Sequence, residues 1–410
     1  MDIRAVIILC LEALLAFWLL RRAGMLRRKA DWYLSALLIA AAFFLRYLCL
    51  DYVTLDYKDF LSRWVSFYRE HGGFDAFSYP LGNYNIPYMY FLCLFSYSDI
   101  SDLYLIKLLS IFFDVLLAYG SMMLLSKAKD SNGLCLACFF TVLFLPTVIL
   151  NGSLWAQCDS IYVALAILAL YCALDDRPVV SVLLFTLSFG FKLQAVFVMP
   201  IMAVLWFKGK YRLWHFLLFP LFYVLLVLPA VLLGKPFLDT VTLYFSQTGS
   251  IGSGMNYNSP SVFAMLRGLK DEALASKLAI AAAFLWMLLI LVFCYVNRSR
   301  LDNTALILAA VLLAVGIPFL LPHMHDRYFF AADILTVVLA YSCGACFAVA
   351  PLTQFASLLG YHAYLKMRYL LYMDHGSRAL IGVLLISVSA LVYKVYRASP
   401  DDGDFAETKI

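Results

Sequence analysis

Long apolar stretches recur along the chain and are separated by short polar segments. About 18 or more apolar residues form a helix long enough to cross a hydrocarbon layer of about 30 Å, and such stretches recur from Ile3 to Val395. The pattern predicts an all-α polytopic membrane protein with about 11–13 transmembrane helices. The predicted spans, two of them short legs, are 3–20, 32–50, 102–126, 134–150, 157–174, 178–190, 194–207, 213–233, 277–296, 303–320, 328–349, 352–372 and 379–395.

The segment 178–207 is apolar over 30 residues and has basic residues at both ends. A single helix of that length would be about 45 Å long, which exceeds the thickness of the hydrocarbon layer. Arg177 before it and Lys208 after it place both ends on the same side of the membrane. We therefore expect this segment to double back, with Lys192 and Gln194 below the outer surface and inside the protein.

The basic residues gather in loops that fall on one side of the membrane if the spans alternate. Cytoplasmic loops carry an excess of Lys and Arg, so this side is predicted to be the cytoplasmic face of the plasma membrane. The N-terminus is then outside, the tail 397–410 is inside, and the long loops 51–101 and 234–276 are outside. The basic residues are Arg21, Arg22, Arg27, Arg28, Lys29, Lys127, Lys129, Lys208, Lys210, Arg212, Arg397 and Lys409.

Composition excludes an ordinary soluble protein. The chain is 64% hydrophobic and 14% charged, whereas a soluble domain is roughly half apolar and about a quarter charged. Its net charge of +5 comes mostly from Lys and Arg beside the spans, so nucleic acid is not an expected partner. Most of the ten cysteines lie in apolar runs, which predicts packing cysteines without a disulfide framework. We expect 1–20 to be the first span and not a cleaved signal peptide.

The loop 51–101 is unusually aromatic, with fifteen aromatic residues between positions 51 and 100. Phe60, Trp64, Phe67 and Tyr68 share one face of a predicted helix. Pro87 can begin a second helix, over 87–98, that is too short to span. Both are predicted to lie in the membrane interface, as a roof over a surface site.

Three carboxylates, Asp51, Asp56 and Asp59, follow directly after a span that ends outside. A carboxylate at this level can act as a general base on an acceptor hydroxyl, or it can hold a divalent cation. The alternative for each of the three is a solvated charge at the interface. Their place in an aromatic, membrane-lying loop favours a function for at least one of them.

The segment 151–160, NGSLWAQCDS, is predicted to be an external turn with Gln157 and Asp159 at the start of the next span. A carboxylate buried there costs roughly 2.5–3.5 kcal/mol on insertion scales, which favours a paired or functional group. A hairpin turn also needs polar residues, so an ordinary turn is the alternative. Lys192, at the apex of the doubled-back segment, is predicted to bind phosphate or to pair with a carboxylate.

The segment 321–330, LPHMHDRYFF, is a further external turn, and it crowds His323, His325, Asp326 and Arg327 together. The planar guanidinium of Arg suits phosphate recognition. Two His at i and i+2 also suit a metal, but no further ligand pattern accompanies them. An interfacial anchor is the third interpretation of this turn.

Span 102–126 contains Lys107 near its outer end and Asp114 deeper down. Asp114 is expected to face the interior and to pair with another span. The four groups of polar residues in the loops all fall on the outer side. This placement suits chemistry on a membrane-anchored phosphate better than transport, which places ionisable groups near the midplane of two related halves.

The order of these motifs resembles the GT-C superfamily of polytopic glycosyltransferases. It is more closely similar to bacterial membrane proteins related to the second mannosyltransferase of glycosylphosphatidylinositol-anchor synthesis. The resemblance covers about 32–350 and implies a catalytic module there, after a segment 1–31 and before spans 351–396. It is carried by the Asp loop, NYNIPYMY, a Lys-containing span followed by an Asp, WAQCDS, FKLQAVF and HMHDRYFF.

The resemblance implies a GT-C-like fold with interfacial helices in the first large external loop. It also implies transfer of a mannose-like hexose from a polyprenyl-phosphate-linked donor to a glycan, lipid or protein acceptor outside the cytoplasm, usually with inversion. The essential acidic residue of the first loop falls on Asp56, with Asp59 as second choice, in a pattern that ends at Trp64.

The remaining motifs match with two departures. Ala156 stands where the turn of the family usually has Gly, and Asp326 stands where its last turn usually has Glu. The roles implied for donor phosphate binding fall on Lys192, Gln194, His325 and Arg327. Substrate or structural support falls on Trp64, Tyr84, Asn85, Gln157, Asp159 and Asp326.

Two other functions remain open. One is a transporter or flippase of lipids or lipid-linked sugars, and the other is a ligase or polymerase that uses a diphosphate lipid donor. We assign no metal ligands and no cofactor, and a divalent cation on the Asp carboxylates remains the alternative to a general base. The lipid bilayer is the expected partner of either class.

Overall fold

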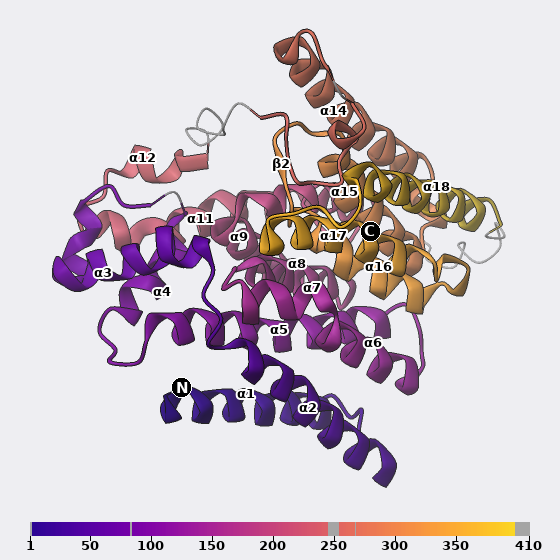
Figure 1. Ribbon diagram of the computed structural model, residues 1–410. Helices are drawn as coiled ribbons and strands as arrows, with labels where there is room; N and C mark the ends of the chain where they lie inside the picture. The colour runs from indigo at the N-terminus through magenta and orange to yellow at the C-terminus, as the bar shows by residue number, and fades with distance from the viewer. Residues whose placement is uncertain (1, 83, 245–253, 267, 398–410) are drawn as a thin grey trace.

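The computed structural model describes residues 2–82, 84–244, 254–266 and 268–397 (Figure 1). Within these residues, eight helices are long and apolar enough to cross a membrane. They correspond to eight of the thirteen predicted spans, those at 3–20, 32–50, 102–126, 213–233, 277–296, 303–320, 352–372 and 379–395. The eight are α1 (Ile3–Arg22), α2 (Lys29–Cys49), α5 (Asp102–Ser126), α11 (Leu213–Leu232), α14 (Glu272–Val296), α15 (Asn303–Leu320), α17 (Val349–Lys366) and α18 (Met373–Arg397).

The other predicted spans form shorter or broken helices. The span predicted at 134–150 bends by 42° where a first helix ends at Phe144. The 16 residues of the helix over Asp159–Leu174 extend only about 24 Å at 1.5 Å per residue. The shorter elements are α6 (Asn132–Phe144), α7 (Pro146–Val148), η3 (Ile149–Leu154), α8 (Asp159–Leu174), α9 (Pro178–Phe191), η4 (Leu193–Phe197), α10 (Ile201–Phe207) and α16 (Phe330–Ser342).

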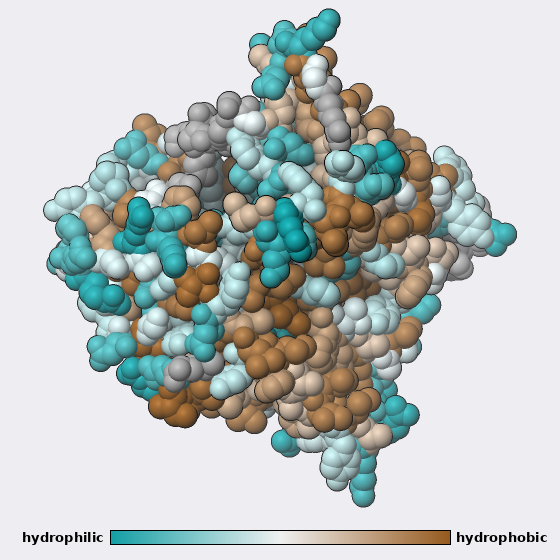
Figure 2. All heavy atoms as spheres, viewed as in Figure 1, coloured by the Kyte–Doolittle hydropathy of each residue, from teal (hydrophilic) through white to brown (hydrophobic). Residues whose placement is uncertain are grey.

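Helices α5 and α15 form the centre of the bundle, with 72% and 89% of their most apolar windows buried in the protein. The corresponding share is 33% for α1, 22% for α11 and 17% for α14. In Figure 1, α1 and α2 lie at one margin of the molecule and α14 lies at the opposite margin. Figure 2 shows brown, apolar side chains over much of the centre of this face. These exposed apolar helices are those of an integral membrane protein of several spans.

The segment 178–207 doubles back, as its flanking charges predict. Lys210 after it donates to Asp176 before it, with Nζ 2.7 Å from Oδ1. Lys208 Nζ lies 3.2 Å from the carbonyl oxygen of Arg298, and Lys394 Nζ lies 2.8 Å from Asp302 Oδ2. The basic loops after α8, α10 and α14 are therefore gathered at one end of the bundle.

The loop after α2 folds back over the opposite end of the bundle. It contains η1 (Tyr57–Leu61), α3 (Ser62–Glu70), η2 (Gly73–Ser78) and α4 (Ile86–Phe95). The helical face predicted in α3 is buried only in part, because Tyr68 is 1% exposed whereas Phe60 is 51% exposed. Asn85 caps α4 through a hydrogen bond of 2.8 Å to the backbone N–H of Ile86. Contacts with α9 and α11 bury much of α4.

The predicted outer loop 234–276 closes over the same end, although its residues 245–253 and 267 lie outside the described residues, as do residues 398–410 of the predicted tail 397–410. Strand β1 (Asn256–Tyr257) pairs in parallel with β2 (Met324–His325). The loop between α15 and α16 thus lies beside a segment that is far away in sequence. The remaining short elements are α12 (Phe237–Val241), η5 (Val262–Ala264), η6 (Arg298–Arg300) and η7 (Gly344–Cys346).

Candidate functional site

Asp56 lies in the turn between α2 and η1, and three side chains hold its carboxylate. Trp155 Nε1 donates to Oδ2 at 2.9 Å, and Gln157 Nε2 donates to the same oxygen at 2.8 Å. Tyr364 donates its hydroxyl to Oδ1 at 2.7 Å. These donors come from the turn before α8 and from α17, so the carboxylate is fixed by segments that are far apart in sequence.

The turn before α8 can present both Trp155 and Gln157 because the backbone changes direction at Ala156. Ala156 has φ 65°, in the left-handed region that favours glycine. The glycine that the resemblance expects at this position would fit that conformation. Thr54 Oγ1 donates to the carbonyl oxygen of Trp155 at 3.0 Å, which ties the Asp56 loop to this turn.

Lys107 on α5 anchors the beginning of the Asp56 loop. Its ammonium lies 2.8 Å from the carbonyl oxygen of Cys49, 2.9 Å from that of Leu50 and 2.6 Å from that of Tyr52. The side chain is fully buried. It therefore satisfies carbonyls that the C-terminus of α2 leaves without helical partners, and it brings a cation to the negative end of the helix dipole.

Asp159, at the first position of α8, is the centre of a buried charge cluster. Lys192 Nζ lies 2.5 Å from Asp159 Oδ1, and Arg327 Nε lies 3.6 Å from Oδ2. Asn151 Nδ2 donates to Oδ2 at 2.8 Å. The side chain of Asp159 is 0% exposed and that of Lys192 is 8% exposed. The doubling back of 178–207 brings Lys192 to this cluster.

Arg327 connects the charge cluster to the Asp56 carboxylate. Its guanidinium carbon lies 5.1 Å from the centre of the Trp155 ring, and Trp155 is the side chain that donates to Asp56. Asp326 Oδ1 lies 3.4 Å from Arg327 Nη1. The Arg327 side chain is 16% exposed, so its cation–π and ionic contacts are screened little by water.

Among the described residues, neither Arg327 Nε, a donor in the charge cluster, nor Gln157 Oε1, an acceptor beside Asp56, has a hydrogen-bond partner, and both atoms are buried. Buried polar groups normally have partners, because an unpaired one costs about 1–3 kcal/mol. A ligand with an anionic group and hydroxyls would complement both atoms. Its anionic group could accept from Arg327 Nε, and one of its hydroxyls could donate to Gln157 Oε1.

His325 and Asp326 are adjacent, and burial moves the pKa of each towards its neutral form. The His325 ring stacks on Tyr257, with centroids 4.6 Å apart and an interplanar angle of 11°. Burial, with the nearby cations Arg327 and Lys192, lowers the pKa of His325 to about 4. Burial raises the pKa of Asp326 to about 7, against the effect of Arg327.

Other predicted site residues lie around this cluster or apart from it. Tyr84 lies within electrostatic range of Lys192 and Arg327, and its ring meets the edge of Trp64 at 5.7 Å. Gln194 lies close enough to Tyr328 to affect the pKa of its hydroxyl, and Tyr328 is next to Arg327 in sequence.

Asn85 and Asp59 do not join the cluster. Asn85 Nδ2 donates to Tyr223 at 3.0 Å while its oxygen caps α4, so its contacts are those of a helix cap. Asp59 is half-exposed and lies 3.6 Å from Arg63. Asp59, the second choice for the essential acidic residue, therefore lies away from Lys192 and Arg327.

Several residues of the site were not predicted from the sequence. They are Asn151, Tyr361 and Tyr364, and Tyr361 accepts from Asn151 at 3.0 Å. Tyr361 and Tyr364 belong to α17, beyond the predicted end of the catalytic module at residue 350. Asn151 is the first residue of the turn predicted at 151–160 and offers a weak signal, whereas the tyrosines lie in an apolar span that offers none.

The buried Asp114 pairs with another span, as predicted. Arg46 on α2 donates to Asp114 Oδ2 at 2.9 Å, and both side chains are 0% exposed. Ser160 donates to Oδ1 at 2.5 Å. Arg46 lies within the predicted span 32–50, and the sequence reasoning did not identify it as the partner.

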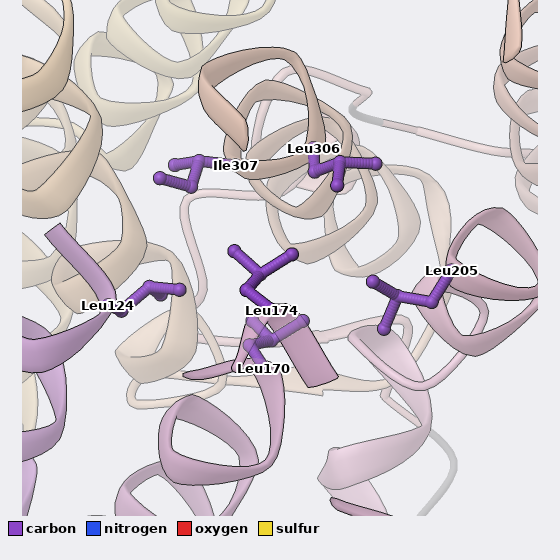
Figure 3. Close-up of a pocket in the computed structure, with 6 residues that line it drawn as sticks. All are labelled: Leu124, Leu170, Leu174, Leu205, Leu306 and Ile307. Atoms are coloured by element: carbon purple, nitrogen blue, oxygen red, sulfur yellow. The ribbon is translucent and has the colours of Figure 1, made fainter. Parts of the chain in front are cut away.

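A partly open apolar pocket at the basic end of the bundle does not share the polarity of this cluster. Figure 3 shows six aliphatic side chains that surround it, from α5, α8, α10 and α15. Its aliphatic side chains offer no hydrogen-bond partner to a phosphate or a hydroxyl. The six lining residues are Leu124, Leu170, Leu174, Leu205, Leu306 and Ile307.

In the part of the chain that the structure covers, no three or more His, Cys, Asp or Glu side chains are grouped so as to hold a metal ion. The sequence matches no model of a known protein family, and no curated protein is significantly similar to it.

Proposed function

We propose that the protein is an inverting glycosyltransferase with a GT-C-like fold that uses a polyprenyl-phosphate-linked sugar as its donor. The observation that carries the proposal is the arrangement around Asp56. A carboxylate held by three donors lies beside a buried cluster of Lys192, Arg327 and Asp159. A general base and a preplaced site for an anionic leaving group are what such a transfer requires.

In the proposed reaction, Asp56 takes the proton from the acceptor hydroxyl. The acceptor oxygen forms a bond to the anomeric carbon from the face opposite the phosphate. The bond between the anomeric carbon and the phosphate oxygen breaks, and its electron pair leaves with the lipid phosphate. Lys192 and Arg327 stabilise the charge that develops on that phosphate, with the unpaired Arg327 Nε as one hydrogen-bond donor.

The charges of the cluster favour a monophosphate donor. Lys192 and Arg327 contribute two positive charges and Asp159 contributes one negative charge. Asp326, with its pKa raised to about 7 by burial, is partly neutral near neutral pH. The net charge of these four groups near neutral pH therefore lies between 0 and +1, which complements the single negative charge of a phosphodiester better than the two charges of a diphosphate.

The proposed site faces outward in a plasma membrane. The loops rich in Lys and Arg gather at the opposite end of the bundle, and such loops face the cytoplasm in membrane proteins. The acceptor is then a glycan, lipid or protein outside the cytoplasm. The carboxy-terminal end of α18 is on the cytoplasmic side.

The test compares purified wild type, Asp56→Asn and Asp59→Asn for transfer of labelled hexose from polyprenyl-phosphate donors to membrane acceptors. We expect Asp56→Asn to lose at least about 100-fold in rate, since general-base catalysis contributes about 10²–10⁴-fold. Asp59→Asn is the matched control, because its carboxylate is half-exposed and pairs with Arg63. Equal transfer by wild type and Asp56→Asn would remove Asp56 from the mechanism.

Two arms of the same experiment address the alternative functions. Transfer from diphosphate donors alone indicates a ligase or polymerase. Movement of labelled lipid across a vesicle bilayer without cleavage of the sugar–phosphate bond indicates a flippase. Either result contradicts the proposed reaction.

A further inference from the structure

Helix α17 contacts Asp56, the proposed general base, through Tyr364. The residue lies just before the end of α17, where Met367 turns into the left-handed region with φ 51°. Its ring stacks on Trp155, with centroids 4.1 Å apart and an interplanar angle of 16°. Its hydroxyl donates to Asp56 Oδ1 at 2.7 Å. The two stacked rings therefore donate to different oxygens of one carboxylate.

The hydrogen bonds of Asp56 leave its two oxygens unequal. A carboxylate oxygen has two lone pairs. Oδ2 accepts from both Trp155 and Gln157, so both of its lone pairs are used. Within the part of the chain that the structure describes, Oδ1 accepts from Tyr364 alone. The one position left for a substrate hydroxyl among these contacts is therefore on Oδ1, beside the tyrosine oxygen.

We propose that Tyr364 is a positioning residue for Asp56, which fixes the carboxylate so that Oδ1 receives the proton and which holds it in the ionised form. The transfer of the proton to Oδ1 rests on the proposed function, whereas the hydrogen bond by which Tyr364 fixes the carboxylate does not. A hydrogen bond to a charged acceptor stabilises it by about 1.5–3 kcal/mol. Removal of the tyrosine hydroxyl therefore favours the protonated acid and frees the side chain to rotate.

The other groups that act on Asp56 are few and come from two segments. Trp155 and Gln157 belong to the turn before α8. His325 and Asp326 in the loop before α16 interact with Asp56 electrostatically, and Arg327 lies next to Asp326. We expect these groups to keep their places in Tyr364→Phe, which removes only a hydroxyl, so that a change in Asp56 can be attributed to that hydroxyl.

The first experiment needs no enzymatic activity. Full-length wild type, Tyr364→Phe and Tyr341→Phe are treated with a water-soluble carbodiimide and glycine ethyl ester, and labelling is followed by mass spectrometry. The reagent attacks the protonated carboxyl. We expect Asp56 to be labelled about tenfold faster in Tyr364→Phe, as about 1.4 kcal/mol corresponds to a factor of ten. Tyr341→Phe is matched, because its hydroxyl lies 2.7 Å from Thr141 and away from the site.

Asp59 is the internal reference for the folded state of each variant. It is half-exposed, so its labelling should be the same in all three proteins. Faster labelling of Asp56 and Asp59 together would show general loosening and would contradict a specific hold by Tyr364. Labelling of Asp56 at the wild-type rate in Tyr364→Phe would overturn the proposal.

The second experiment measures the pH dependence of transfer from a polyprenyl-phosphate hexose. We expect the acid limb of kcat/KM in Tyr364→Phe to move about one pH unit upward, with the alkaline plateau and the KM for the donor close to wild type. A merely structural role would lower the rate by the same factor at every pH, and that result contradicts the proposal. Absence of transfer by wild type together with faster Asp56 labelling in Tyr364→Phe would refute the proposed function and leave the hold on Asp56 established.

Discussion

Lys192 and Asp159 form an ion pair in the interior of the protein, with Nζ 2.5 Å from Oδ1 and side chains that are 8% and 0% exposed. The two residues belong to different helical segments, and the pair exists because the chain after α9 turns back towards its start. Asp159 also accepts from Asn151 at 2.8 Å. The ammonium is thereby held at a fixed point beside Arg327.

The first prediction is that Lys192→Gln lowers the proposed transfer by at least about 100-fold and raises the KM for the donor. A preplaced charge that stabilises a developing anion is worth about 2.7–4 kcal/mol. Transfer kinetics with a polyprenyl-phosphate donor are the measurement. Lys208→Gln is the control, because Lys208 contacts the carbonyl oxygen of Arg298 at the other end of the bundle. Equal losses in both variants would contradict a local role for Lys192.

The second prediction concerns the buried pair of Arg46 and Asp114, in which both side chains are 0% exposed. Removal of one partner leaves an uncompensated charge, at a cost of about 3–5 kcal/mol. Arg46→Met should therefore lower the thermal unfolding midpoint markedly. The double variant Arg46→Met/Asp114→Leu should recover most of that loss, because no charge is then left unpaired. A double variant as unstable as the single one would contradict this account.

The positions of most helices follow from hydrophobicity alone, because a lipid-facing or buried helix must be apolar along its length. The reversal near Lys192 also follows from the sequence, since positive charges flank both ends of 178–207. These features depend on local composition, which a single sequence contains.

Helix length and partner choice are less accessible to sequence reasoning. The apolar run of α8 begins at Asp159, in the interior of the protein. Its sequence is similar to that of a run that begins at the membrane surface, so the sequence does not distinguish the two cases. The span predicted at 352–372 continues over apolar residues, whereas α17 ends at Lys366 because Met367 adopts a left-handed conformation. No local pattern relates Tyr364 to Asp56 or Arg46 to Asp114, because those contacts join segments distant in sequence.

The third prediction is an unusual pH dependence of stability that arises from two neighbouring residues. The pKa of His325 is about 4 in the folded protein and 6.5 when unperturbed, so the unfolded state binds more protons between these values and stability rises with pH. The pKa of Asp326 is about 7 in the folded protein and 3.8 when unperturbed, so the folded state binds more protons and stability falls as pH rises. The two effects oppose each other between about pH 4 and 6.5.

Single substitutions should separate these effects. In Asp326→Asn, stability should rise by a few kcal/mol from about pH 4 to 6.5, since one pKa unit corresponds to about 1.4 kcal/mol. In His325→Gln it should fall by a similar amount from about pH 4 to 7. Thermal unfolding midpoints in detergent at several pH values are the measurement, with wild type flatter than either variant. Parallel curves for all three proteins would contradict the opposed titrations.

The last prediction is that Lys107 acts on the base through the backbone. Its ammonium contacts the carbonyl oxygens of Cys49, Leu50 and Tyr52 at 2.8, 2.9 and 2.6 Å, where the chain leaves α2 for Asp56. Lys107→Met removes these donors and leaves the carbonyls buried without partners, at about 1–3 kcal/mol for each group that water does not reach. We expect lower thermal stability and a loss of about tenfold or more in kcat, because a small displacement of a catalytic group is costly.

The KM for the donor should change little in Lys107→Met, since Lys192 and Arg327 are held by Asp159 and not by this loop. Lys107→Arg should recover part of the loss, because it restores donors at the end of α2. Lys127→Met is the control. It removes a lysine at the C-terminal end of α5 that pairs with Asp175 at the basic end of the bundle, away from Asp56. A Lys107→Met protein with lower stability but wild-type kcat would show that the anchor supports the fold without positioning Asp56.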